Sequence, residues 1–454
     1  MKKVLLLLLC LMLIASTVIG CSSTKTESTP APSEEESQAP EKSSAPEDVV
    51  LEGDVTFWGG AHLTNISEIV LEDFAAANPG VNISYEKYPF AEYPTKMKLQ
   101  LSSNQSDPDI MIIHDFLAKQ FIKAGWVLDI TDEVPREDLL QNYETIVDGS
   151  KVYGIPMQST CMTFMYREDI FNDLGLTPPT NLDEYVALAN TLKENGYFID
   201  AYDPSVNAKD LYLIFLNMIG GGIYDKEGNV ILDTDAGKGA AALEMVSTLY
   251  ESGIWHKSSS YHNDEYWTAM NDGQIAAIFG PSYAAAYFDT NVDPEGAGGY
   301  GLWKIAAPPK IAEDGLDQYQ ESSTYYIVNS MSDQPELATE IIKYLGCSVE
   351  AGKTFTEINR EGTMARVVNN YIPSLESIAQ DSAPWPAFGD QKVLSFVAET
   401  MLAYCPMTAY KDSRAAETDT IVDQTLAEYF VEGNMTIEET IAEMAEQINR
   451  LEIK

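Results

Sequence analysis

Short apolar runs alternate with amphipathic stretches in the first part of the chain. At residues 66–77 the apolar positions recur at helical spacing, and this predicted helix ends at Asn78-Pro79-Gly80. Residues 110–113 are a continuous apolar run, which is typical of a strand buried on both faces. The order is strand, helix, strand, helix, strand, over residues 55–58, 66–77, 81–85, 92–103 and 110–113. This order predicts a doubly wound α/β lobe.

The same alternation continues along the rest of the chain. Further apolar runs predict strands at residues 162–166, 275–279 and 324–328. A last helix is expected to start at Thr436, where Glu439 completes a capping box. A chain of 454 residues with these elements is too long for one ordinary domain, so we expect two.

Aromatic and polar residues follow two predicted strands of the first lobe. Trp58 closes the first strand, and His114 and Asp115 follow the third. Ligands of open α/β sheets collect at the carboxyl ends of the strands. We therefore expect these residues to border a ligand site.

The first twenty residues read as a secretory signal. Lys2 and Lys3 precede an apolar run at residues 4–14, which is too short to span a bilayer. Cys21 follows Val18-Ile19-Gly20, a sequence that resembles the bacterial lipobox, in which the cysteine thiol is lipidated. The alternative is an ordinary secretory signal with an incidental cysteine.

A tether is predicted directly after this cysteine. Residues 22–47 are rich in Ser, Thr, Pro and Glu and contain no large apolar residue, so they cannot bury enough surface to fold. We therefore assign residues 1–20 to a lipoprotein signal peptide and residues 21–52 to the lipidated cysteine and a disordered linker.

Net charge and cysteine content are the features of the composition that bear on function. The net charge is −42, and it falls to −44 when the signal removes two lysines, which argues against binding nucleic acid or anionic lipid. Beyond Cys10 and Cys21 only Cys161, Cys347 and Cys405 remain. Their odd number and wide spacing predict no disulfide framework, although one pair stays open.

No catalytic motif is present, so we expect no enzyme and no cofactor. The sequence lacks a nucleophile elbow, a zinc-protease helix, a phosphate loop and a dinucleotide fingerprint. Four histidines occur, and His62 and His114 both follow strands of the first lobe, which keeps a metal-binding protein open as a rival; the other two are His256 and His262. A glycosidase would need two carboxylates opposed across a cleft, and no spacing indicates such a pair.

Several short motifs in sequence order resemble the extracellular sugar-binding proteins of bacterial ABC importers, the family that includes maltose-binding protein. The similarity covers nearly the whole chain from about Asp54 to Lys454. The motifs are Val55-Thr-Phe-Trp58, Asn78-Pro79-Gly80, Asp107-Pro-Asp-Ile110, residues 124–131, Lys151-Val-Tyr-Gly-Ile-Pro156, Tyr166-Arg-Glu-Asp-Ile-Phe171, residues 176–180 and residues 270–281.

This resemblance implies a periplasmic-binding-protein-like fold of type II, with two doubly wound α/β lobes joined by a hinge that the chain crosses more than once. The crossings are expected near residues 155–158, 303–308 and 359–364. The N-lobe would then comprise residues 53–155 and 304–358, and the C-lobe residues 156–303 and 359–454.

The resemblance also implies the protein's partners and location. An oligosaccharide would bind between the lobes, and closure would present both lobes to the permease subunits of an ABC importer. We expect a monomer at the extracellular face of the bacterial cytoplasmic membrane, in contact with the membrane through its lipid anchor only.

Candidate ligand residues come from the resemblance and from the chemistry of sugars. His114 and Asp115 match a His-Asp pair whose aspartate accepts sugar hydroxyls, and Ser282 stands where maltose-binding protein has a stacking tryptophan, with Tyr283 as a substitute. A sugar offers an apolar face to aromatic rings and hydroxyls to carboxylates and amides. The candidates for the face are Trp58, Tyr283, Trp303 and Trp385, and those for the hydroxyls are Asp115, Gln158, Asp203 and Arg360.

For each of these residues a role in the core or on the surface stays open as the alternative. Trp303 in particular lies beside a predicted hinge strand, which favours a structural role. The chief rival function is the same fold binding a polyamine, a peptide or a metal, and a glycan-active enzyme is the more distant one. A polyamine site would show several carboxylates and few neutral polar groups.

Overall fold

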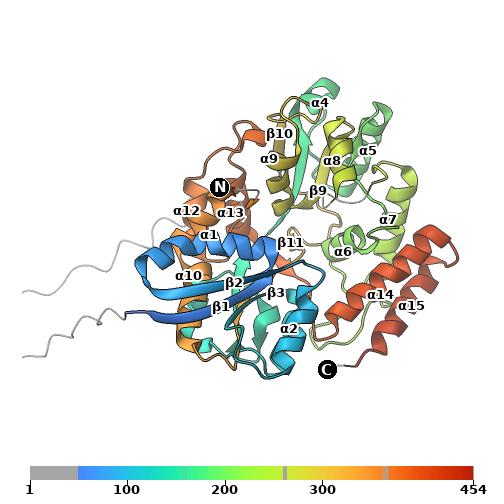
Figure 1. The fold of residues 1–454 in the computed structure, drawn as a ribbon. Coiled ribbons are helices and arrows are strands. Elements are labelled where there is room, and N and C mark those ends of the chain that lie inside the picture. The colour runs from blue at the N-terminus through green and yellow to red at the C-terminus, as the bar shows by residue number, and fades with distance from the viewer. Residues whose placement is uncertain (1–49, 159, 259–262, 361–362, 365–366, 453–454) are drawn as a thin grey trace, which may run out of the picture. The chain divides into compact units, whose positions relative to one another are not determined.

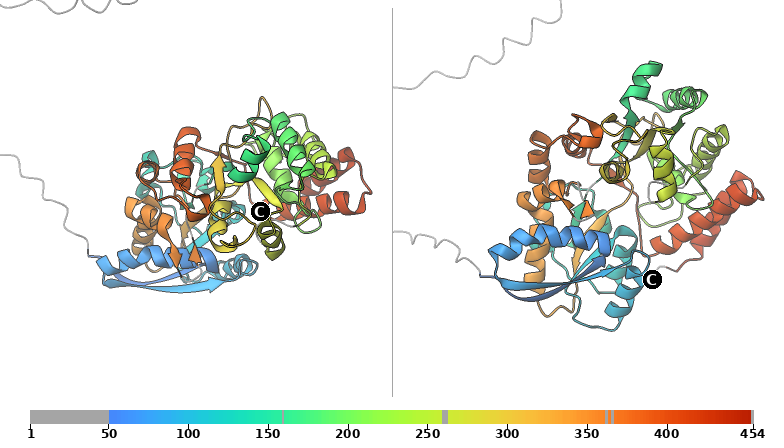
Figure 2. Two further views of the ribbon diagram at one scale, coloured as in Figure 1. Left: turned by 90° about the horizontal axis from the view of Figure 1, so that it is seen from above. Right: turned by 45° about the horizontal axis from the view of Figure 1, so that its top comes forward.

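The computed structural model describes residues 50–452, except residues 159, 259–262, 361–362 and 365–366. In this range the chain forms two α/β lobes, each built on its own sheet (Figures 1 and 2). The predicted signal peptide, Cys21 and most of the linker lie outside the described residues. No helix within the described ranges combines the length and apolarity that a membrane span needs.

The sheet of the first lobe carries the strands that border the cavity described below. β1 runs parallel to β2 and β3, whereas β12 runs antiparallel to both β3 and β6, so the carboxyl ends of β1, β3 and β6 meet at one edge. The order is β2 (Gly80–Tyr88), β1 (Glu52–Gly60), β3 (Ile110–His114), β12 (Thr324–Val328) and β6 (Ile155–Gln158).

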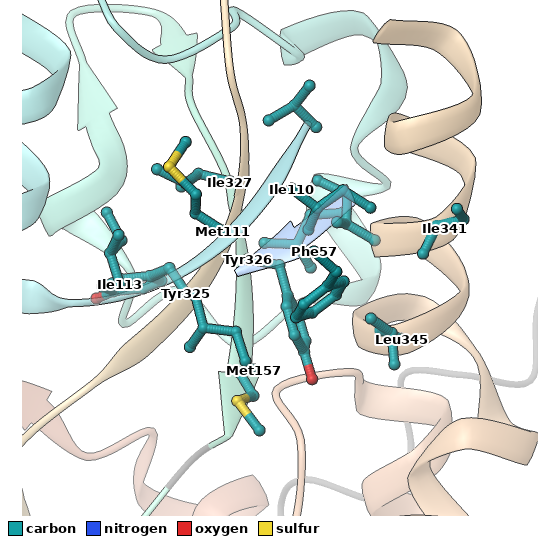
Figure 3. Close-up of a cluster of buried hydrophobic side chains, with 14 of the residues drawn as sticks. Phe57, Ile110, Met111, Ile113, Met157, Tyr325, Tyr326, Ile327, Ile341 and Leu345 are labelled. Carbon is teal, nitrogen blue, oxygen red and sulfur yellow. The ribbon is translucent and has the colours of Figure 1, made fainter. Parts of the chain in front are cut away.

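The apolar run of β3 is buried as expected, because helices cover both faces of this sheet. Phe57, Tyr326 and Ile341 pack together in its core, and Figure 3 shows this cluster. The helices that contribute to the core are α1 (Ala61–Ala77), α2 (Tyr93–Ser102), α3 (Asp115–Lys123), α10 (Pro335–Cys347) and α11 (Val349–Glu357).

The second lobe has a four-stranded sheet with an apolar core on each face. Side chains of successive residues alternate between the two cores, as Phe164 and Met165 of β7 do. The strand order is β10 (Trp303–Ala306), β7 (Met162–Arg167), β9 (Ile275–Pro281) and β8 (Phe198–Ile199).

Helices complete the two cores of this lobe. One core contains α5 (Leu182–Glu194), α6 (Lys209–Met218), α7 (Gly239–Ser252), α14 (Ala415–Ala427) and α15 (Ile437–Asn449), and α4 (Glu168–Leu174) lies beside it. The other contains α8 (Asp264–Asn271), α9 (Phe288–Asn291), α12 (Ile372–Gln380) and α13 (Val393–Tyr404).

The capping box expected at the last helix is confirmed. The Thr436 side chain accepts a hydrogen bond from the Glu439 N–H, and the Glu439 carboxylate accepts one from the Thr436 N–H at 2.9 Å. Two of the four N–H groups that a helix start leaves unpaired are thereby satisfied. Ile441, Met444 and Ile448 of this helix are buried.

The resemblance led us to expect the second crossing near residues 303–308. The chain returns to the first lobe later than that. β10 pairs antiparallel with β7 in the second lobe, and Ile305 and Ile311 are buried in the cores of that lobe. The chain reaches the first sheet only at Thr324, after the short strand β11 (Tyr319–Gln320), which pairs with β15 (Met407–Thr408). The boundary at residue 304 is therefore corrected to the segment between β11 and β12.

The first and third crossings each lie between an element of the first lobe and an element of the second. β6 ends at Gln158 and β7 begins at Met162, and the third crossing falls between α11 and α12, where Val367 packs on the core of the first lobe and Val368 on a core of the second. Cys161, Cys347 and Cys405 are free thiols among the described residues.

Candidate functional site: a cavity between the lobes

A cavity of about 1660 Å³ lies between the two lobes. Both lobes line it, and so do the crossing segments, so relative movement of the lobes would change its size. Its volume exceeds the ~300–1,000 Å³ of common small-molecule pockets, which leaves room for an extended solute. The main lining stretches are residues 60–66, 114–116, 209–227, 283–291 and 409–419.

The wall from the first lobe is built on strand ends. Gly60 closes β1, His114 closes β3, and Gln158 closes β6, and all three residues line the cavity. The edge where parallel strands end is where the sequence predicted a ligand site. His114, Asp115 and Gln158 are thus brought together by the topology of the sheet.

Aromatic rings surround His114 on this wall. Its ring stacks on that of Phe116 at 5.6 Å between centroids and meets the edge of Phe90 at 5.1 Å. Burial lowers the pKa of His114 to about 4, and nearby Asp115 raises it only in part. The imidazole is therefore neutral at neutral pH. Its Nε2 atom has no hydrogen-bond partner within the described part of the chain.

Tyrosines form much of the wall from the second lobe. Tyr283 donates a hydrogen bond to Glu321 at 2.9 Å, and Tyr287 and Tyr319 line the cavity nearby. Tyr224 and Tyr410 meet edge to face at 6.3 Å and also face the cavity. Each ring offers an apolar face, and each hydroxyl offers a hydrogen-bonding group.

Tyr224 lies at the base of a hairpin turn that Arg414 holds in place. The turn closes between Tyr224 and Val230 and contains Asp225 to Asn229. Arg414 donates to the Gly228 carbonyl at 2.6 Å, bonds the Asp412 carboxylate, and lies 4.5 Å from the centre of the Tyr224 ring. The hairpin therefore forms a fixed rim of the cavity.

Charged groups lie on the cavity floor, which comprises Asp115, Glu321, Lys411 and Asp419. Asp115 accepts hydrogen bonds from Lys411 Nζ at 2.9 Å and from the Ser323 N–H at 3.2 Å. Although burial lowers the pKa of Lys411, the carboxylates of Asp115 and Asp419 raise it above its usual value, so this lysine stays protonated.

Two of the floor carboxylates are harder to ionise than usual. Burial, followed by repulsion from Asp210, raises the pKa of Glu321 to about 7. Burial also raises the pKa of Asp419, with Lys411 opposing the change. Burial thus favours the protonated form of Glu321, whose carboxyl group can donate as well as accept.

The structure does not bring the remaining candidates to the cavity wall. Trp58, Trp303 and Trp385 are buried in the lobe cores and absent from the cavity lining, so the structure assigns them to packing. Ser282 is buried as well, and its hydroxyl accepts the Cys161 N–H at 3.3 Å. The physical reason is that each of these residues lies on a strand or loop face that packs inward.

The last two candidates are Asp203 and Arg360. The Asp203 carboxylate caps its own turn by accepting the Ser205 N–H at 2.9 Å, and it borders a small neighbouring cavity that shares Asp210 and Glu321 with the large one. The backbone of Arg360 belongs to β13 (Asn359–Arg360), which pairs with β14 (Thr363–Met364), and its side chain lies outside what the structure describes.

Several cavity residues had no role in the sequence-based prediction. Phe116 follows Asp115 directly and could have been found from that position. Phe90, Tyr224, Tyr410 and Lys411 carry no local signal, because they reach the cavity from loops whose place depends on distant contacts.

The described residues contain no cluster of three or more His, Cys, Asp or Glu side chains arranged to hold a metal ion. His62 lines the cavity, and burial lowers its pKa. His256 is bonded to the Ser258 hydroxyl at 2.9 Å, and His262 lies outside the described residues.

Comparison with known proteins matches most of the chain to one protein family. Residues 41–346 match the family described as bacterial extracellular solute-binding protein. The arabinooligosaccharide-binding protein of Halalkalibacterium halodurans is 24% identical over 335 residues, which is 69% of this chain and 72% of that protein. The lactose-binding protein of Rhizobium radiobacter is 23% identical over 300 residues, which is 63% of this chain and 68% of that protein.

Solved structures share the two-lobed fold. Maltose-bound MalE3 of T. maritima superposes with a TM-score of 0.68 at 16% identity, covering 87% of this chain and 99% of that one. The lacto-N-biose complex of the galacto-N-biose-/lacto-N-biose I-binding protein of Bifidobacterium longum gives a TM-score of 0.68 at 18% identity, covering 89% and 97%.

Proposed function

The chain belongs to the bacterial extracellular solute-binding proteins, and we propose that it captures an oligosaccharide between its lobes and delivers it to the permease of an ABC importer. The observation that carries this proposal is the composition of the cavity walls. Aromatic rings from both lobes share the cavity with uncharged polar groups, and a sugar needs both kinds of contact.

Neutral polar groups are plentiful in the cavity. They include the amides of Gln158, Asn217 and Asn291 and the hydroxyls of Thr290 and Ser322, in addition to the tyrosines. Such groups donate to and accept from hydroxyls without requiring a charged solute.

Most cavity carboxylates already have partners within the protein. Asp115 bonds Lys411, Asp210 pairs with Lys209 at 3.3 Å, and Asp225 accepts the Asn229 amide at 2.8 Å. A polyamine would instead need several uncompensated carboxylates along its length. The partnered carboxylates and the many neutral polar groups therefore favour a neutral, hydroxyl-rich solute over a polyamine. The sugar-binding relatives support the same conclusion.

Replacing Phe90 by alanine tests the use of the cavity. Phe90 lines the cavity and its side chain is 61% exposed, so its loss should remove a stacking face at little cost in stability. We expect about a tenfold loss of affinity, equivalent to ~1.4 kcal/mol. A thermal-shift screen of arabino-, galacto- and malto-oligosaccharides would supply the sugar, and calorimetric titration would give the affinities.

The matched control is Leu99→Ala, because Leu99 is also an exposed apolar residue but lies outside the cavity lining. It should leave affinity unchanged. A screen in which polyamines, but no oligosaccharide, stabilise the protein would contradict the proposal. Recovery of the bound sugar unchanged after long incubation is expected of a binding protein, and cleavage products would reveal an enzyme instead.

We further propose that Cys21 is lipidated and holds a monomeric protein at the extracellular face of the cytoplasmic membrane. The supporting observations are the signal-like start, the cysteine after Gly20 and the polar stretch at residues 22–47. Because one chain supplies both cavity walls, a single copy is sufficient for binding. Light scattering of detergent-solubilised protein would detect a dimer.

The substitution Cys21→Ala should leave an unprocessed precursor or release the protein from the membrane fraction. Fractionation with intact-mass measurement checks this outcome, and Cys10→Ala is the matched control because Cys10 lies inside the predicted signal. Unchanged mass and membrane retention in Cys21→Ala would exclude lipid anchoring at this residue.

A further inference from the structure

We propose that the ion pair between Asp115 and Lys411 is a latch that joins the two lobes across the cavity floor and shifts the protein toward its closed form before any sugar binds. This inference rests on the proposed function in one respect only, namely that the lobes open and close. It assigns to Asp115 a role different from the acceptor of sugar hydroxyls that the sequence led us to expect.

Asp115 is fixed to the first lobe. It is the first residue of α3, and at the crossing segment just before β12 its N–H donates to the Ser323 carbonyl at 3.0 Å, while its carboxylate accepts the Ser323 N–H at 3.2 Å. Leu117 and Phe121 of the same helix are buried in the core of the first lobe. The carboxylate therefore moves with this lobe.

Lys411 is fixed to the second lobe. It lies in the short segment between β15 and α14, and its neighbours Ala409 and Tyr410 pack against a core of that lobe. Val422 and Leu426 of α14 are buried in the same core. The ammonium group of Lys411 thus reaches out of one lobe to the carboxylate of the other, at 2.9 Å.

Little water reaches this pair. The side chains of Lys411 and Asp115 are only 19% and 4% exposed, so both charges depend on each other for compensation. Parting the lobes would let water solvate both charges, so the pair favours closure by the amount that its Coulomb and hydrogen-bond energy exceeds the cost of desolvating the two groups. α14 contacts α3 beside this pair, so an opening movement that separates these two helices breaks the contact.

Asp419 makes the latch reversible. It belongs to α14 of the second lobe, lines the same floor and attracts Lys411 electrostatically. Lys411 is therefore attracted by one carboxylate from each lobe and is hydrogen-bonded to Asp115 of the first lobe. When the lobes part, the attraction of Asp419 within the second lobe persists and, together with entering water, limits the cost of release.

The latch also predicts an effect on sugar affinity. A solute that binds the closed form gains apparent affinity in proportion to the fraction of protein already closed. Loss of the pair should weaken binding even of a solute that never touches Lys411.

Distance measurement on sugar-free protein tests the latch directly. We would use the full chain in detergent, with fluorophores attached through unnatural amino acids at the exposed positions Leu99 in the first lobe and Val431 in the second, and single-molecule energy transfer as the readout. Lys411→Met should raise the ratio of open to closed molecules about tenfold, and Asp115→Asn should act in the same direction.

Two further variants serve as controls. Lys411→Arg keeps the charge and should preserve most of the closed population. Lys343→Met breaks ion pairs to Glu133 and Glu340 within the first lobe and should leave the distances unchanged. Melting curves for each variant identify any that fails to fold, and either Lys411→Met or Asp115→Asn alone suffices for the test.

Identical distance distributions in wild-type protein and in a folded Lys411→Met variant would overturn the proposal. A wild-type protein whose lobes are already apart without sugar would overturn it too. Since no sugar is added, these results are independent of whether the glycan screen succeeds, and failure of the latch is distinguishable from failure of the proposed function.

Discussion

Replacing Trp303 by alanine is expected to lower the free energy of unfolding by about 3–5 kcal/mol. The side chain is fully buried, its Nε1 donates to the Gly298 carbonyl at 2.8 Å, and its ring meets that of Phe288 at 4.8 Å. The substitution leaves a large apolar cavity and an unpaired carbonyl. Chemical denaturation of the purified variant measures the loss.

Trp58→Ala is expected to behave in the same way, because this tryptophan is 7% exposed and packs against Tyr88 in the core of the first lobe. The contrast is Phe90→Ala, which should lower affinity with little change in stability. If Trp303→Ala or Trp58→Ala lost affinity at unchanged stability, the residue would act on the ligand, and the cavity lining described above would be wrong there.

Arg414→Met is expected to cost about 3–5 kcal/mol of stability, because it leaves a buried carboxylate without its cation. Asp412 and Arg414 are both nearly inaccessible to solvent, and the guanidinium group also holds the Gly228 carbonyl and the Tyr224 ring. Chemical denaturation measures the loss. Hydrogen exchange of residues 222–231 should increase, since the hairpin loses its attachment to α14.

The double variant Asp412→Asn/Arg414→Met is the matched control. Removing both charges is expected to restore part of the stability, because no unpaired charge stays buried. Exchange in the hairpin should nevertheless remain fast, as the contact with Gly228 is still missing. If the Arg414→Met variant were as stable as the wild type, water or another side chain would have to compensate the charge of Asp412.

Local sequence patterns were enough to predict the first five elements of the first lobe, their order and one edge of the cavity. The apolar run of β3, the helix stop at Asn78-Pro79-Gly80 and the capping box at Thr436 are local patterns, and local hydrogen bonding and side-chain periodicity decide them. The prediction that His114 and Asp115 lie at a strand edge also needs only the order of the elements.

The tertiary structure decided which side chains face the cavity and which lobe holds each segment. The pattern at Trp303 and Ile305 predicts a strand but cannot say which sheet it joins, and pairing with β7 places it in the second lobe. Likewise, an aromatic residue at a strand end has the same local sequence whether it stacks on a solute or packs in a core. Which of the two roles the residue has depends on the side chains that distant segments place around it.

The pair of Asp115 and Lys411 shows this limit most clearly. The two residues are separated by 296 positions, and nothing near either one in the sequence indicates the other. Their contact depends on the packing of α14 into the second lobe and on the return of the chain at Ser323. Such contacts follow from the sum of many weak packing interactions across the fold, and no single stretch of sequence contains that sum.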